Sequence, residues 1–201
     1  MKQFIQFKSL VILVYGLCLF CIQSCDTATT PTGDQPLASS KMELAKNWHI
    51  VSADGLESDG TEISQVSFDP AGWHEATMPS TVLATLVNNG VYKDIFYGKR
   101  MAELPELWKQ EWWYRTEFEA PEQTEGKQYF LKFTGINYKA DIYLNGKLIA
   151  DTNQVAGAFR VYEFNVSDGI LPGQTNALAL KITPPKNVGY EGVELTFSYV
   201  D

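Results

Sequence analysis

Short runs in which apolar and polar residues alternate recur along the chain from Trp48 onward, with turn-forming residues between them. A period of two is typical of a β-strand with one buried face. The runs are NWHIV, GWHEATM, EWWYRTEF, KQYFLKF, KADIYLNGKLIA, FRVYEFNV, NALALKI and VELTFSY. Eight short strands at this spacing predict an all-β fold, an antiparallel sandwich or jelly roll.

One segment breaks the pattern. Residues 79–90, PSTVLATLVNNG, place apolar side chains at helical spacing after Ser80 and Thr81, either of which could cap a helix amino terminus. Gly90 supplies a stop signal at the other end. The sequence therefore predicts one short helix inside the all-β pattern.

The clearest turn is Asn145-Gly146, between KADIYL and KLIA. These two residues favour the type I′ turn of a two-residue β-hairpin. Alternation places Ala140, Ile142 and Leu144 on one face of the first strand and Asp141 and Tyr143 on the other. We expect the first face to be packed and the second to be wet.

The run EWWYRTEF raises a question about Trp113. Trp112, Tyr114, Thr116 and Phe118 share one face of this strand, whereas Trp113 shares the other with Arg115, Glu117 and Glu119. Trp113 is then an aromatic ring among charged groups. An exposed ring in such a place predicts a binding platform or a contact with another domain.

The amino terminus has the pattern of a targeting segment. Lys2 and Lys8 precede an apolar run from Leu10 to Ile22, whose length suits a signal peptide. Ser24-Cys25 and the Ser/Thr/Pro-rich stretch that follows resemble a bacterial lipoprotein signal, in which the cysteine carries the lipid. We expect a signal over 1–24, lipid on Cys25, a tether over 25–40, a folded domain over 41–201 and a place in the bacterial cell envelope. The alternative is an ordinary secretory signal with an incidental cysteine.

The negative net charge of the chain limits the classes of molecule that it is expected to bind. The chain has 16 basic and 24 acidic residues and a formal charge of −8. Residues 1–24 contain two lysines and no acidic residue, so the remainder would carry −10 from 14 basic and 24 acidic groups. Nucleic acid is therefore not an expected partner, because binding it requires a basic surface.

The small number of histidines limits the catalytic and metal sites that the sequence can support. Only His49 and His74 are present, so no Ser-His-Asp triad and no metal site can be argued, and no cofactor is expected. Aromatic residues are plentiful near expected loops: Trp73, Tyr92, Phe96, Tyr97, Trp108, Trp112, Trp113 and Tyr114. Rings interleaved with Asp94, Arg100, Arg115 and Asn137 would suit a carbohydrate, whereas most single rings are expected to fill a core.

The order of segments resembles a known family. MPSTVLATLVNNGVYKDIFYGKRM, EWWYRTEFEAP and the stretch from YFLKFTGINYKADIYLNG to NALALKI are similar, in this order, to the amino-terminal domain of family 2 glycoside hydrolases. GVYKDIFYG together with WWYRTEF resembles the branch of exo-β-D-glucosaminidases and β-mannosidases. The resemblance covers about residues 41–201 and implies a galactose-binding-like jelly roll.

The resemblance also implies what this chain does not contain. Family members continue into a sandwich and a (β/α)8 barrel that carries two catalytic glutamates, so no residue here is assigned a catalytic role. In this branch an Asp-Trp pair follows a strand like LTFSYV, and Asp201 matches that aspartate. The expected sugar-binding residues are Asp201, Trp113, Asp94 and Arg100, for a β-linked amino sugar or mannoside. The alternative function is a free-standing carbohydrate-binding lipoprotein.

Overall fold

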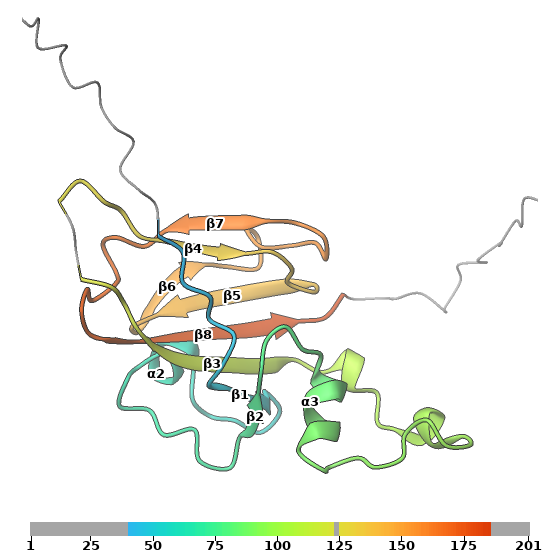
Figure 1. Cartoon of the computed structure of the whole chain (residues 1–201). Helices are drawn as coiled ribbons and strands as arrows, with labels where there is room; N and C mark the ends of the chain where they lie inside the picture. Colours follow the sequence, from blue (N-terminus) through green and yellow to red (C-terminus); the bar gives the residue numbers. More distant parts are fainter. Residues whose placement is uncertain (1–39, 123–124, 186–201) are drawn as a thin grey trace, which may run out of the picture. The chain divides into compact units, whose positions relative to one another are not determined.

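The structure is a computed structural model and describes residues 40–122 and 125–185 (Figure 1). The run VELTFSY, the expected signal over 1–24, residues 25–39 of the expected tether with Cys25, and Asp201 lie outside these residues. Each of the other seven runs contains a strand, and KADIYLNGKLIA contains two. The strands are β1 Trp48–Ser52, β2 His74–Ala76, β3 Trp112–Glu119, β4 Phe130–Phe133, β5 Lys139–Leu144, β6 Lys147–Ala150, β7 Tyr162–Asn165 and β8 Thr175–Thr183.

The strands form two antiparallel sheets. The larger sheet has six strands in the order β2-β1-β3-β8-β5-β6, and the smaller sheet pairs β4 with β7. Strand β8 lies at the centre of the larger sheet, between β3 and β5, so its burial on both sides fits its nearly continuous apolar sequence. This arrangement confirms the expected antiparallel sandwich.

The main core lies between the two sheets. Leu131 and Phe133 of β4 and Tyr162 and Phe164 of β7 face the larger sheet, whereas Lys132 and Glu163 face outward and form an ion pair. The larger sheet contributes fully buried side chains from β5 and β8: Ala140, Ile142, Leu144 and Leu178. Alternation along β5 was therefore predicted correctly, and the hairpin turn has the expected positive φ angles at Asn145 and Gly146.

The second face of the larger sheet is covered, which the sequence did not predict. The connection from β1 to β2 folds back over it and includes helix α2, Gly60–Ile63. Ile63, Trp113 and Ala179 form a second core there, with Tyr143 packed against them. The expectation of a wet face on β5 is thus wrong for Tyr143, and the expectation of a single helix is wrong as well.

The predicted helix is α3, Val82–Asn88. Thr81 is its cap, since its side-chain oxygen accepts a hydrogen bond of 3.1 Å from the backbone N–H of Ala84. Gly90 follows the helix with a φ angle of +74°. Leu86 of α3 packs on Ile50 and Trp112 in a third apolar cluster, which fixes the helix beside β1 and β3.

Candidate functional site

The chain between α3 and β3 forms an irregular segment, residues 91–105, which we call the 91–105 loop. Ile95 is buried, and Tyr92 packs on the apolar cluster around Trp112, so the loop is anchored at these two side chains. Two short 3₁₀ helices follow, η1 Arg100–Glu103 within the loop and η2 Leu107–Lys109 after it. The loop therefore has a defined backbone although it contains no strand.

The structure brings the predicted residues Asp94 and Arg100 together. An Arg100 guanidinium nitrogen (Nη1) lies 3.0 Å from the Asp94 Oδ2 atom. Asp94 has a φ angle of +52°, and the Arg100 guanidinium lies over the Tyr97 ring, 5.8 Å from its centroid. The pair is exposed, so its contribution to stability is small, but it gives the loop a fixed arrangement of one carboxylate, one guanidinium and one ring.

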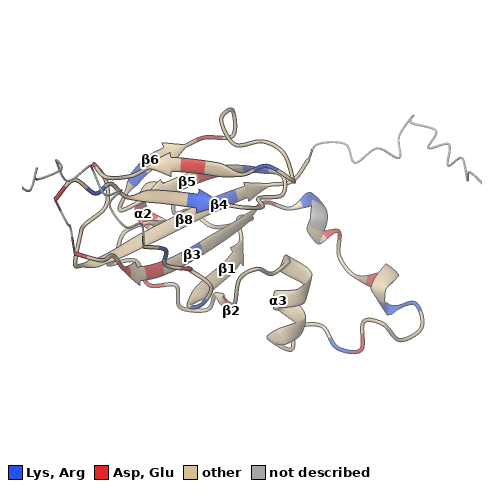
Figure 2. Ribbon diagram, turned by 45° about the horizontal axis from the view of Figure 1, so that its top comes forward, with Lys and Arg blue, Asp and Glu red and all other residues tan. Residues whose placement is uncertain are grey.

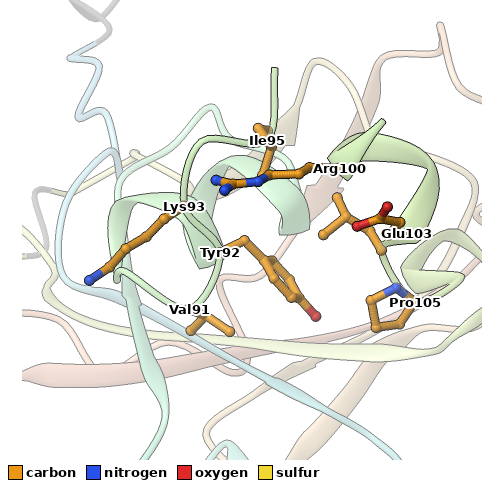
Figure 3. Close-up of a pocket in the computed structure, with 8 residues that line it drawn as sticks. Val91, Tyr92, Lys93, Ile95, Arg100, Glu103 and Pro105 are labelled. Atoms are coloured by element: carbon orange, nitrogen blue, oxygen red, sulfur yellow. The ribbon is translucent and has the colours of Figure 1, made fainter. Parts of the chain in front are cut away.

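A hollow of about 310 Å³ opens beside this pair. Its walls are Val91, Tyr92, Lys93, Ile95, Arg100, Glu103, Leu104 and Pro105, all from the 91–105 loop. Figure 3 shows the Tyr92 ring near the middle of the hollow with its hydroxyl toward Pro105, while the Lys93 side chain leads away. Charged groups of both signs thus surround a floor made of an aromatic ring and aliphatic side chains.

Two aromatic side chains project from the same loop. Phe96 is 87% exposed and Tyr97 is 75% exposed. Figure 2 shows Lys or Arg and Asp or Glu alternating along this part of the chain. Two neighbouring exposed rings provide apolar surface that a ligand or another domain could contact. Sequence reasoning named both rings as carbohydrate candidates but missed Glu103, which carries no signal beyond its charge.

The expected exposure of Trp113 is wrong. Its side chain is 5% exposed and packs against Ile63 and Ala179 under α2, with the Tyr143 ring centroid 6.1 Å away. The parity of β3 was predicted correctly, but its second face is covered by the β1–β2 connection. Trp113 therefore offers no surface for a sugar ring or for another domain.

Arg115, two residues after Trp113 in the sequence, bonds the β1–β2 connection to the larger sheet. It is buried, and its guanidinium donates hydrogen bonds of 2.9 Å to the backbone carbonyls of Ile63 and Gln65. It also pairs with Glu117 on the same face. Arg115 is thus a structural residue that ties α2 to the sheet.

The chain leaves the described structure at the end of the sheet that carries the 91–105 loop. Ile182 of β8 pairs with Trp112, the first residue of β3 after the loop, and Thr183 pairs with Lys139. Figure 1 shows β8 ending on the side where α3 and the 91–105 loop lie. We call this the exit end. Asp201 lies outside the described residues, so its expected part in sugar binding stays a prediction.

No candidate metal-binding cluster lies within the described residues. Across residues 40–122 and 125–185, no group of three or more His, Cys, Asp or Glu side chains could hold a metal ion. Burial raises the pKa of the Tyr114 hydroxyl to about 12, and burial also raises the pKa of Tyr143. Both rings pack on apolar clusters of the larger sheet.

The chain matches the family model described as the galactose-binding-like domain of glycosyl hydrolase family 2, over residues 48–195. An exo-β-D-glucosaminidase of Amycolatopsis orientalis is 32% identical over 137 residues, which are 68% of this chain and 13% of that protein. A mannosylglycoprotein endo-β-mannosidase of Lilium longiflorum is 31% identical over 158 residues, 74% of this chain and 16% of that protein.

Solved structures agree with these matches. The exo-chitosanase of Amycolatopsis orientalis superposes with a TM-score of 0.64 at 31% identity, covering 70% of this chain and 16% of that one. A β-D-mannosidase of Dictyoglomus thermophilum gives 0.54 at 28% identity, covering 72% and 16%. The chain thus spans less than a fifth of the length of these relatives.

Proposed function

The chain belongs to glycoside hydrolase family 2 through its galactose-binding-like domain, and from this membership we propose that it serves an exo-acting β-glucosaminidase or β-mannosidase as its amino-terminal accessory domain. Two relatives named for activity on β-glucosaminides or β-mannosides each match about 70% of the chain. They match it with less than a fifth of their own length. The hydrolytic step is accordingly assigned to parts of such an enzyme that lie beyond this domain.

The observation that carries the proposal is the concentration of binding features at the exit end. The Asp94–Arg100 pair, the exposed Phe96 and Tyr97 rings and the 310 Å³ hollow all belong to the 91–105 loop. Strand β8 ends at the same end of the sheet. Thr183, the last residue of β8, therefore lies at the end of the sheet that carries this loop.

The chemistry of the loop suits a contribution to a sugar pocket. A sugar presents C–H groups that stack on a ring and hydroxyls that hydrogen-bond to charged groups. One face of Tyr97 is occupied by Arg100, so a sugar or a downstream domain would use the other face or the neighbouring Phe96. Asp94 has oxygen lone pairs left after its bond to Arg100 and can accept from a hydroxyl.

A chimera tests this proposal. The first domain of the Amycolatopsis orientalis enzyme would be replaced by residues 40–201 of this chain, and hydrolysis of an aryl β-D-glucosaminide would be measured. We expect more activity than in the same enzyme with its first domain deleted. Tyr97→Ala and Asp94→Ala in the chimera should raise KM, whereas Lys132→Ala, on the outer face of β4, should not. A folded chimera without activity, or equal effects of all three substitutions, would contradict the proposal.

We further propose that lipid on Cys25 holds the protein at the bacterial cell envelope. The support is the sequence pattern alone: an apolar run, Ser24 before Cys25 and a polar stretch after it. No helix in the described part of the chain is long and apolar enough to cross a membrane. Cys25→Ser should abolish incorporation of labelled palmitate and release the protein from the membrane fraction, whereas Cys21→Ser should leave both unchanged. Labelling that persists in Cys25→Ser would overturn this proposal.

A further inference from the structure

A second and larger hollow lies at the opposite end of the sheet from the 91–105 loop. Its volume is about 460 Å³, within the range of about 300–1,000 Å³ that small-ligand pockets occupy. Three segments form it, residues 65–67 after α2, the hairpin turn 145–147 and the turn 168–171. Asn145 follows Leu144, which pairs with Leu178 near the start of β8. The hollow is therefore separated from the exit end by the length of β8, and we call it the turn hollow.

Hydrogen bonds hold the three walls in place. The Gly146 N–H donates to the Ser64 hydroxyl over 2.9 Å, and that hydroxyl donates to the Gly60 carbonyl, so the hairpin turn is tied to α2. The Asn145 amide donates to the Gly169 carbonyl over 2.9 Å, which ties the hairpin turn to the third wall. Ser64 is fully buried. A pocket with walls fixed in this way loses little conformational entropy when a ligand binds.

Buried Asn176 completes this framework. Its side-chain oxygen accepts hydrogen bonds from the Asn145 amide and from the Leu171 N–H, and its amide donates to the Leu171 carbonyl. Both asparagines are thus occupied with structural bonds. The groups left for a ligand are other side chains of the walls.

Those remaining side chains are polar and unpaired. Gln65, Ser67, Lys147 and Asp168 line the turn hollow, and no side-chain hydrogen bond or ion pair to another described residue involves them. Lys147 and Asp168 carry opposite charges but are not bonded to each other. The walls therefore provide a carboxylate that accepts, an ammonium group that donates, and an amide and a hydroxyl that do both.

Exposed aliphatic side chains accompany these polar groups. Val66 and Leu171 line the hollow and are 44% and 42% exposed, and Leu148, next to Lys147, is 53% exposed. These groups suit a ligand that combines apolar C–H faces with groups that donate and accept hydrogen bonds. A saccharide has that combination, and a net charge is not required because the two wall charges balance.

We propose that the turn hollow is a saccharide-binding site, separate from the sugar-pocket role of the exit end. Lys147 and Asp168 would bond to sugar hydroxyls, and Val66 and Leu171 would contact the C–H face of the ring. The proposal rests on the geometry of the hollow and stands whether or not the exit end serves a catalytic domain.

The test is an NMR titration of the whole chain with mannotetraose and, separately, with a β-1,4-glucosamine tetramer. At least one saccharide should shift backbone amide signals of residues 65–67, 145–147 and 168–171. Lys147→Met and Asp168→Asn should each weaken that binding about tenfold, because each removes one charged hydrogen-bond partner. Lys132→Met, on the outer face of β4, should leave it unchanged. Because these three side chains lie at the surface, thermal midpoints should be nearly those of the unaltered chain.

Three results would overturn the proposal. They are no shifts with either tetrasaccharide, shifts that involve only the 91–105 loop, or binding that Lys147→Met and Asp168→Asn do not weaken. Shifts only in the 91–105 loop would at the same time support the function proposed for the exit end, so the two proposals fail separately. Glycylglycine serves as a zwitterionic control, and binding of this peptide without saccharide binding would also overturn the proposal.

Discussion

Gly60 shows how one residue decides whether the second face of the larger sheet can be covered. It begins α2 directly over Tyr143, and a Cβ atom at this position would overlap the tyrosine ring. Tyr143 in turn packs beside Trp113. The absence of a side chain at residue 60 therefore allows α2 to approach the sheet, where Trp113 is buried and Tyr143 is partly buried.

We predict that Gly60→Ala lowers the free energy of unfolding by about 1–3 kcal/mol, because the new methyl group forces the helix or the ring to move. The matched control is Gly135→Ala, where no atom lies near the added methyl group and φ is not positive. That control should change stability by less than about 0.5 kcal/mol. Urea denaturation of the two variants compares them, and equal stabilities would contradict this account of α2.

The same contact explains why the environment of Trp113 could not be predicted from sequence. Alternation assigned Trp113 to the correct face of β3, because side-chain parity depends only on neighbouring residues. That face is covered by Ile63 and the rest of the α2 segment, which lies about 50 positions earlier in the chain. Arg115 donates a hydrogen bond to the Ile63 carbonyl and so holds this segment on the sheet. The alternation of apolar and polar residues predicted the direction of the Trp113 side chain but not the residues that surround it.

At the scale of the secondary-structure elements, short sequence patterns predicted most of the strands and turns correctly. The Asn145-Gly146 hairpin and α3 were predicted because their sequence signals lie within the elements themselves. Helix α2 was missed because its four residues are too few to show a helical period, and its cap, Asp59, has the composition of an ordinary turn. Asp94 and Arg100 were named from their residue types, but their contact was not predicted, because alternation encodes neither the positive φ angle at Asp94 nor the approach of the two side chains.

The cap of α3 offers a test at this scale. Sequence alone left Ser80 and Thr81 as alternatives, and the structure assigns the cap to Thr81. We predict that Thr81→Ala costs about 1 kcal/mol of unfolding free energy and that Thr81→Ser restores most of it, because serine keeps the accepting oxygen. Thermal unfolding followed by circular dichroism measures both. A loss in Thr81→Ser as large as in Thr81→Ala would show that the methyl group, and not the cap, matters.

At the scale of the whole molecule, the arrangement separates two binding regions. The 91–105 loop lies where β8 ends, and the turn hollow lies where β8 begins. Contacts between segments far apart in the chain pair β4 with β7. Such contacts also bring distant loops together at each end of the larger sheet. Sequence periodicity does not encode such contacts. The spacing of the strands predicted a sandwich or jelly roll, and the order of segments added the resemblance to the family.

Family membership also underlies our proposal that this domain contributes binding contacts while another part of the enzyme carries out hydrolysis. The matched part of the chain corresponds to 13% of the length of the Amycolatopsis orientalis exo-β-D-glucosaminidase. A family 2 enzyme hydrolyses with two carboxyl groups held a fixed distance apart across the bond. An accessory domain contributes contacts to that site and does not turn over substrate by itself.

The most direct test of this central claim is the rate at which the purified chain hydrolyses aryl β-D-glucosaminides and β-D-mannosides, with the full-length Amycolatopsis orientalis enzyme as the positive control. We predict no hydrolysis above the buffer rate at any concentration of the chain. Hydrolysis that rises in proportion to the chain and persists through repeated purification would contradict the account, because the chain would then carry its own catalytic groups.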